Sequence, residues 1–242
     1  MPHSLRSPDD MVTATRVVDL SHVVEDGMVT YPGLPGPEIV DHMSRTDSRD
    51  RYAPGTEFQI GRISMVANTG TYLDAPFHRF SGGIDLAGIP LSRLVDLPGL
   101  VIRAEHRGIG IAELAPYRDS ITGSAVLVHT GWDRHWGTAG YADPSHPFLT
   151  VEATQWITAL RPAVVGIDSV NIDDMSDLSR PAHTGLLAAG IPVIEHLTGL
   201  DLLPDSGFRF HGAPVAVAGM GTFPIRAYAL VPQSATPGTD RS

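Results

Sequence analysis

The segment from Asn68 to His78 gathers side chains that can transfer protons or bind a metal ion. It places an amide (Asn68), a phenol (Tyr72), a carboxylate (Asp74) and an imidazole (His78) within eleven residues, around a glycine and a proline. Imidazoles and carboxylates act in acid–base catalysis, and both bind divalent ions. The same residue types also cap turns, so spacing alone leaves a structural and a catalytic interpretation open. We interpret the segment as a site-forming loop that leaves a strand.

The composition limits what such a site can contain. The chain has 242 residues, no cysteine and a formal net charge of −10. Without cysteine there are no disulfides, thiolate nucleophiles or cysteine-ligated zinc, so any metal must be held by His, Asp and Glu. The negative charge leaves no basic surface for phosphates. We therefore expect a small-molecule substrate as partner, and neither a nucleic acid nor a membrane.

The N-terminal residues MPHSLRSPDD have no apolar core of the length that a secretion signal needs. No apolar run approaches the ~20 residues of a membrane span. Together with the lack of cysteine, this predicts a cytoplasmic protein.

Short runs that favour strands recur along the chain and indicate which elements position the chemical groups. They predict strands at residues 17–20, 58–66, 100–103, 125–129, 164–167, 193–194, 215–218 and 225–231. One helix should follow Thr150 as its N-cap and stop before Pro162. A second should span His183–Ala189, with Gly190 as its left-handed C-terminal residue. The alternation of strand, helix and strand predicts a mixed α/β fold.

One domain is expected at residues 16–231, because no linker or repeat interrupts that range. Residues 1–15 and 232–242 lack periodic apolar positions and are predicted to be flexible tails. Within the domain, the proline-rich loop from Tyr31 to Pro37 is either a stiff surface connection or a preformed wall of a pocket. The second interpretation makes Tyr31 a candidate for substrate binding.

Residues 68–78 resemble the signature H-x-G-T-H-x-D-x-P-x-H of the cyclase family, which includes bacterial kynurenine formamidases and isatin hydrolases. Gly70, Thr71, Asp74, Pro76 and His78 match this signature, whereas Asn68 and Tyr72 stand where it has histidines. Other stretches resemble the same family across roughly residues 16–231, namely 19–22, 31–33, 130–132, 146–147, 166–169 and 183–195.

The resemblance implies the family's swivelling β/β/α domain, with a central barrel-like β-sheet and few helices, assembled as a homodimer or homotetramer. In the family, the signature aspartate binds a divalent metal together with a distant histidine and a glutamate twelve positions after it. Asp74, His183 and Glu195 fit that description, which implies a site for one ion such as Zn²⁺ or Mn²⁺. His78 corresponds to the family's proton-transfer residue.

Asn68 and Tyr72 leave two possibilities for the metal. An amide is a weak ligand and a phenol is protonated near neutral pH, so one of two neighbouring metal sites would be lost or weakened. Alternatively the site is metal-free, and Tyr72 and Asn68 donate hydrogen bonds to a developing oxyanion. Tyr72 is therefore a candidate catalytic residue beside His78, Asp74 and Glu195, and Asn68 a candidate substrate contact.

Weaker candidates lie in two further stretches. Trp132, in the cluster from Trp132 to Trp136, could contact substrate, although a buried tryptophan more often serves packing. Asp168, Asn171, Asp173 and Asp174 lack the Gly and Glu of a calcium loop, so we interpret them as turn residues after a strand beside the active site.

Three functions remain open. The first is a hydrolase resembling kynurenine formamidase, an enzyme type of tryptophan catabolism, that cleaves a formamide, lactam or lactone of a small aromatic or cyclic substrate. The second, suggested by Asn68 and Tyr72, is a metal-independent cyclase or dehydratase of secondary metabolism. The third is a non-catalytic homologue that binds a small molecule.

Overall fold

Four parallel strands form the centre of the fold, which a computed structural model describes for residues 15–233. They belong to a nine-stranded sheet in the order β1-β13-β11-β5-β7-β9-β10-β4-β12. The parallel strands are β5 (Leu97–Arg103), β7 (Ala125–His129), β9 (Val164–Ile167) and β10 (Val193–Glu195). The antiparallel ones are β1 (Thr15–Asp19), β13 (Tyr228–Pro232) and β11 (Ser206–His211) on one side, and β4 (Tyr72–Asp74) and β12 (Thr222–Pro224) on the other.

The central strands are apolar on both faces because both faces are covered. In β7, Val126 and Val128 pack in the core under the helices, whereas Leu127 packs in the second core on the opposite face of the sheet. The sheet curls into a half-barrel around this second core, which confirms the expected barrel-like sheet. Gly166 of β9 allows close packing, since a Cβ there would come within 2.7 Å of the Leu197 side chain.

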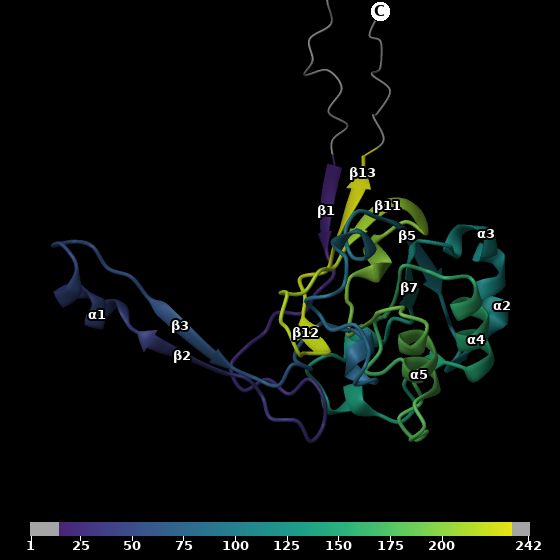
Figure 1. Cartoon of the computed structure of the whole chain (residues 1–242), viewed down its shortest axis with the longest axis horizontal. Helices are drawn as coiled ribbons and strands as arrows, with labels where there is room; N and C mark the ends of the chain where they lie inside the picture. Colours follow the sequence, from purple (N-terminus) through teal and green to yellow (C-terminus); the bar gives the residue numbers. More distant parts are fainter. Residues whose placement is uncertain (1–14, 234–242) are drawn as a thin grey trace, which may run out of the picture.

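Helices cover one face of the sheet, where α2, α4 and α5 lie together (Figure 1). The helix α4 (Val151–Ala159) begins as predicted at Thr150, whose hydroxyl accepts the backbone N–H of Ala153 at 3.2 Å. The helix α5 (Pro181–Ala188) begins two residues before the predicted start, with proline in its first turn. Shorter elements complete this layer: α2 (Ile111–Leu114), α3 (Arg118–Ile121), β6 (Gly108–Ile109) and β8 (Phe148–Leu149).

Most of the predicted strands are confirmed, and one is wrong. The runs at 125–129 and 164–167 coincide with β7 and β9. The prediction for 215–218 is wrong, because only Pro214 makes an isolated bridge there, to Ile225. The site-forming loop contains a strand, β4, which pairs with β10 and β12. Three residues are too few to show the alternation from which a strand is predicted.

Both ends of the described chain lie side by side. Thr15 of β1 pairs with Pro232 of β13, so the sheet extends one residue beyond each limit of the expected domain, 16–231. The other residues of the expected tails, apart from Gln233, lie outside the described range. Within residues 15–233, no helix has the length and apolar character needed to cross a bilayer.

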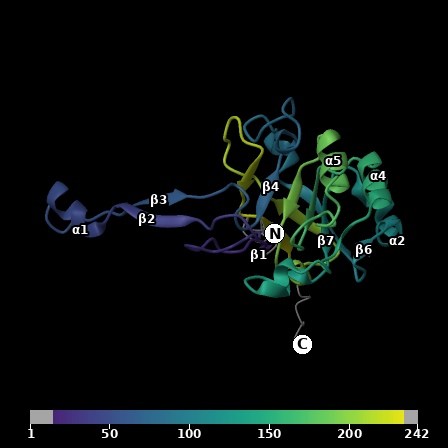
Figure 2. The same cartoon turned by 90° about the horizontal axis from the view of Figure 1, so that it is seen from below.

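A two-stranded arm projects from the sheet. It consists of β2 (Glu38–Met43), α1 (Arg45–Ser48) and β3 (Ile60–Ser64), and both views show it extending away from the rest of the chain (Figures 1 and 2). Apolar side chains on the arm are open to solvent, among them Ile39 (42% exposed), Phe58 (53%) and Ile63 (50%). An isolated hairpin is marginally stable in water. Because these side chains are exposed, packing against the rest of the described chain contributes little to the stability of the arm.

Candidate active site

The site forms where the parallel part of the sheet meets its antiparallel edge. In the β4–β10 pair, Tyr72 lies opposite Glu195 and Asp74 lies opposite Val193. Because side chains two residues apart on a strand point to the same face, Tyr72, Asp74 and Glu195 share one face of the sheet. That face also carries Val193, which packs in the core beneath α5.

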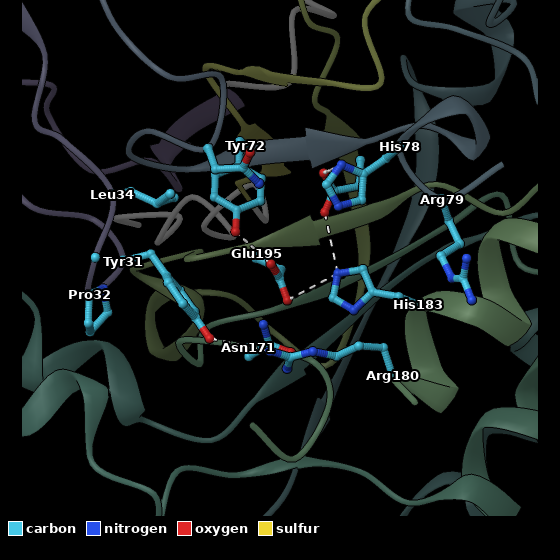
Figure 3. A pocket seen from close by; sticks show the side chains of 13 residues that line it. Tyr31, Pro32, Leu34, Tyr72, His78, Arg79, Asn171, Arg180, His183 and Glu195 are labelled. Carbon is cyan, nitrogen blue, oxygen red and sulfur yellow. Dashed lines mark hydrogen bonds and ion pairs between the residues drawn. The ribbon is translucent and has the colours of Figure 1, made fainter. Parts of the chain in front are cut away.

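Helix α5 brings His183 to the two carboxylates. Its Nε2 atom lies 3.4 Å from Oδ2 of Asp74 and 3.6 Å from Oε1 of Glu195. The three side chains are buried and offer ligand atoms that all lie within 4.8 Å of one another. The structure therefore brings together the three residues that the resemblance singled out (Figure 3).

Asp173 fixes the orientation of His183. Its Oδ2 atom accepts the Nδ1–H of His183 at 2.6 Å, and its two oxygens also accept the backbone N–H groups of Ala182 and His183. With Nδ1 protonated toward Asp173, Nε2 either carries a proton toward Asp74 and Glu195 or offers its lone pair to an ion. We interpreted Asp173 only as a turn residue, and its position ten residues before His183 carries no local signal of this contact.

Thr222 connects Asp74 to His78. Its hydroxyl donates a hydrogen bond to Oδ1 of Asp74 and lies 2.7 Å from Nδ1 of His78. A hydroxyl has one proton to give, so the second contact makes the His78 Nδ1–H the donor, and in the neutral imidazole Nε2 is then unprotonated. Gly221 permits this approach, since a side chain there would overlap the backbone of His78. Sequence reasoning missed Thr222, which lies 144 residues from His78.

Tyr72 and Glu195 are joined in a buried chain of hydrogen bonds. The phenol of Tyr72 donates to Oε2 of Glu195 at 2.7 Å, and the backbone N–H of Ile172 donates to Oε1 at 2.7 Å. The Tyr72 oxygen lies 3.2 Å from Nε2 of His196, whose Nδ1 lies 2.7 Å from the phenol of Tyr141. With Glu195 ionised and His196 neutral, one set of proton positions satisfies all three side-chain contacts: Tyr141 donates to His196, His196 to Tyr72, and Tyr72 to Glu195.

Burial and charge shift the pKa of each group in this cluster. Burial raises the pKa of Glu195 more than the nearby His183 lowers it. Burial alone would lower the pKa of His183, but Glu195 and the hydrogen bonds to Asp173 and Asp74 raise it well above its usual value. For Asp74, burial is outweighed by the hydrogen bond with His183 and the charge of His78, so its pKa falls. The carboxylates thus favour a positive charge at His183.

Neutral groups surround this charged cluster. Burial raises the pKa of Tyr72, and the adjacent Glu195 raises it further, so the phenol keeps its proton. Burial also lowers the pKa of His196 to about 3. A neutral His196 is what the hydrogen-bond chain requires, because it must accept at Nδ1 and donate at Nε2.

A cavity of about 420 Å³ opens above these groups. Tyr31, Pro32 and Leu34 of the proline-rich loop form one wall, and Asn68 also lines the cavity (Figure 3). Trp132 does not line it: its indole N–H donates to the backbone carbonyl of Tyr141 at 2.8 Å, in keeping with a packing role. The structure thus brings Tyr31 and Asn68, but not Trp132, to the candidate site.

Asp74, His183 and Glu195 fit a divalent ion. Oδ2 of Asp74 is buried and makes no short hydrogen bond within the described part of the chain; Nε2 of His183 lies 3.4 Å from it. Two carboxylates and one imidazole, with the second imidazole nitrogen held by Asp173, form a ligand set that suits Zn²⁺ or Mn²⁺. An ion bound there would give this oxygen a close partner and offset the negative charge.

The sequence is similar to a known protein family and to characterised members of it. The Cyclase family model matches residues 18–174. A kynurenine formamidase from Bacillus cytotoxicus is 25% identical over 215 residues, which cover 88% of this chain and 97% of that protein.

Solved structures share the fold. Isatin hydrolase A from Labrenzia aggregata, bound to benzyl benzoate, has a TM-score of 0.78 at 24% identity, over 90% of this chain and 94% of its own. A potential metal-dependent hydrolase with cyclase activity has a TM-score of 0.74 at 25% identity, over 92% of this chain and 100% of its own. These likenesses confirm the expected mixed α/β fold around a half-barrel sheet.

Replacing Asp173 by asparagine should destabilise the site. Both oxygens of Asp173 accept N–H groups, so the NH₂ group of an asparagine would face a donor that it cannot accept. We therefore expect Asp173→Asn to lower the free energy of unfolding in urea by about 1–3 kcal/mol. The matched control is Asp174→Asn, which alters the more exposed ion pair with Arg107 and should cost less than ~1 kcal/mol. Equal losses in the two variants would contradict the role given to Asp173.

Metal binding should depend on Asp74 and on pH. We expect one Zn²⁺ or Mn²⁺ per chain in isothermal titration calorimetry, and loss of that binding in Asp74→Ala but not in the surface control Asp205→Ala. The raised pKa of His183 means that an ion must displace a proton, so the affinity should rise with pH and protons should be released. Absent or pH-independent binding would contradict this expectation.

Proposed function

Because the chain belongs to the cyclase family, we propose that it is a hydrolase that cleaves an amide or ester bond, as in a formamide, lactam or lactone, of a small aromatic or cyclic substrate. The observation that carries the proposal is the buried group of Asp74, His183 and Glu195 at a cavity of about 420 Å³. The distant relationship to kynurenine formamidases and isatin hydrolases supports this type of bond.

His78 is the proposed proton-transfer residue. Thr222 holds its Nδ1 atom, and Thr222 is in turn held by Asp74, which leaves the Nε2 lone pair free to accept a proton. Its side chain is 37% exposed, so water and substrate can reach it. Nε2 can take a proton from a water that attacks the carbonyl carbon and return it to the leaving nitrogen or oxygen.

Asp74, His183 and Glu195 are the proposed ligands of one divalent ion. When bound, such an ion acts as a Lewis acid that polarises a carbonyl and lowers the pKa of water. We propose that Asn68 and Tyr72 replace two metal-binding histidines, so that one ion is held instead of two. The hydrogen bond from Tyr72 to Glu195 supports this, because a phenol that donates its proton to a carboxylate is not a metal ligand.

A metal-independent cyclase or dehydratase is the second candidate. It is favoured by the buried hydrogen bond between Tyr72 and Glu195: the raised pKa of Glu195 increases the share of protonated carboxyl that can deliver a proton to a leaving hydroxyl, and the Tyr72 phenol keeps its own proton as a hydrogen-bond donor. His78 would then accept the proton released elsewhere on the substrate.

Turnover of a panel of aryl formamides, esters and lactams tests the proposal, with protein purified without chelator. We expect hydrolysis, and a fall in kcat/KM of roughly 10²- to 10⁴-fold in His78→Ala because a general acid–base is lost. The surface control His106→Ala, paired only with Glu113, should keep the wild-type rate.

Three other outcomes would change the proposal. Full hydrolytic activity of protein stripped of metal would remove the divalent ion from the proposed hydrolase mechanism. Undiminished turnover in His78→Ala would remove the proton-transfer assignment from both candidate functions. Binding of panel members without any turnover would point to a non-catalytic homologue.

The exposed arm supports a homodimer. Both strands of the hairpin are open to solvent along nearly their whole length, and Ile39, Ile60 and Ile63 on them are 42%, 47% and 50% exposed. A second copy of the chain is the proposed occupant, because it would cover these side chains and stabilise a hairpin that is marginal alone.

Polar substitutions on the arm should dissociate this dimer. We expect wild-type protein to show the mass of a dimer in light scattering, and the double variant Phe58→Ser with Ile63→Ser to shift toward monomer. Val215→Ser is the matched control, because Val215 is 63% exposed but lies off the arm. A monomeric wild type, or a dimer that survives the double change, would refute this assembly.

A further inference from the structure

Arg180 lines the candidate site with a guanidinium that forms no ion pair with a carboxylate among residues 15–233. Its Nη1 donates to Oδ1 of Asn171 at 3.2 Å and its Nη2 to the phenol of Tyr31 at 3.4 Å, and both acceptors are uncharged. By contrast, Arg107 nearby is paired with Asp174 at 2.8 Å.

Most of the hydrogen-bonding capacity of Arg180 is unused. A guanidinium has five N–H donors, of which two are engaged by Asn171 and Tyr31. The side chain is half-buried and lines the same cavity as His183 and Glu195. Figure 3 shows its side chain reaching toward Asn171 and Tyr31. A half-buried guanidinium with free donors is suited to a planar oxyanion, which it can bind with two parallel hydrogen bonds.

The backbone at Arg180 is held in an unfavourable conformation. Its φ of 51° and ψ of 61° lie in the left-handed region, which favours glycine over residues with a side chain. A glycine would relieve the strain but would leave no side chain in the cavity. Strain of this kind persists where the surrounding structure requires it, and it is found most often at functional sites.

We propose that Arg180 binds a carboxylate of the substrate, so that the preferred substrates are aromatic or cyclic amides or esters that also carry a carboxylate. This inference rests on the proposed hydrolase function, whose substrate class it narrows. The carboxylate is directed to the Tyr31–Asn171 side of the cavity by Arg180, and the bond to be cleaved lies at His183, Glu195 and His78.

The charges of the cavity enforce this orientation. Asp74 and Glu195 lie at the reacting end, where they disfavour an unpartnered carboxylate of the substrate. Arg79 also lines the cavity, but it is exposed and its Nε donates to Thr184 at 3.3 Å. Water screens an exposed charge, so Arg79 attracts anions weakly and without a fixed geometry, whereas the half-buried Arg180 can hold a carboxylate in one orientation.

Matched substrates test the proposal. The first measurement compares kcat/KM for 2-formamidobenzoate and for its uncharged analogue 2-formamidobenzamide. We expect Arg180→Gln to lower kcat/KM for the carboxylate roughly 10- to 100-fold, mainly through KM, and to change that for the carboxamide less than about 3-fold. Arg180→Lys should keep part of the preference, because it retains the charge but not the planar fork. Arg226→Gln is the matched control, because Arg226 is an exposed arginine that pairs with Asp19 and does not line the cavity, and it should change both substrates little.

A binding measurement separates this proposal from the hydrolase function. Isothermal titration calorimetry with benzoate and benzamide should show tighter binding of benzoate to the wild type and no such difference in Arg180→Gln. If no formamide is cleaved but this difference is found, the hydrolase function fails and the carboxylate subsite stands. If both formamides are cleaved alike and benzoate is not preferred, the subsite fails and the hydrolase function stands.

Two further results would overturn the subsite. Equal losses for both substrates in Arg180→Gln would mean that Arg180 only braces Tyr31 against Asn171. Preference for benzoate that persists in Arg180→Gln would mean that another group binds the carboxylate.

Discussion

The structure depends on three buried carboxylates that surround one imidazole. Asp74, Asp173 and Glu195 are almost completely buried, and each approaches His183. Buried charges are costly unless they are paired and hydrogen-bonded, so the surrounding chain must supply partners. It does so through the Thr222 hydroxyl, the Tyr72 phenol, and backbone N–H groups of Ile172 and the start of α5. The excess negative charge still requires a cation, either a proton on His183 or a divalent ion.

The fold meets this requirement at one place in the sheet. Glu195 ends the last parallel strand, and the turn after β9 carries Asp173 toward the N-terminus of α5. Carboxyl ends of parallel strands are the usual location of sites in α/β proteins, because the connecting loops gather there. The antiparallel strands β4 and β12 then add Tyr72, Asp74 and Thr222 from distant parts of the chain. The second core, on the opposite face of the sheet, holds these short strands in register.

The site is polarised from one end to the other. Its buried end is acidic and is enclosed by neutral, fully hydrogen-bonded groups, including the chain from Tyr141 through His196 and Tyr72 to Glu195. Its other side carries the guanidinium of Arg180 beside Asn171 and Tyr31. In the proposed function, such a separation of charge would orient the substrate before any bond is broken. The hydrogen bond from Tyr72 to Glu195 is consistent with the proposal that Tyr72 supports Glu195 and does not bind metal.

The sequence alone determined the strands β7 and β9 and the start of α4, since long apolar runs and an N-cap are local signals. It also singled out Asp74, His78, His183 and Glu195, through their resemblance to a family signature. Tertiary structure alone decided the roles of Asp173, Thr222, His196 and Arg180. Their contacts join residues up to 149 positions apart. A hydrogen bond between distant residues leaves no periodicity or spacing in the sequence, because it exists only once the sheet and α5 have brought its two ends together.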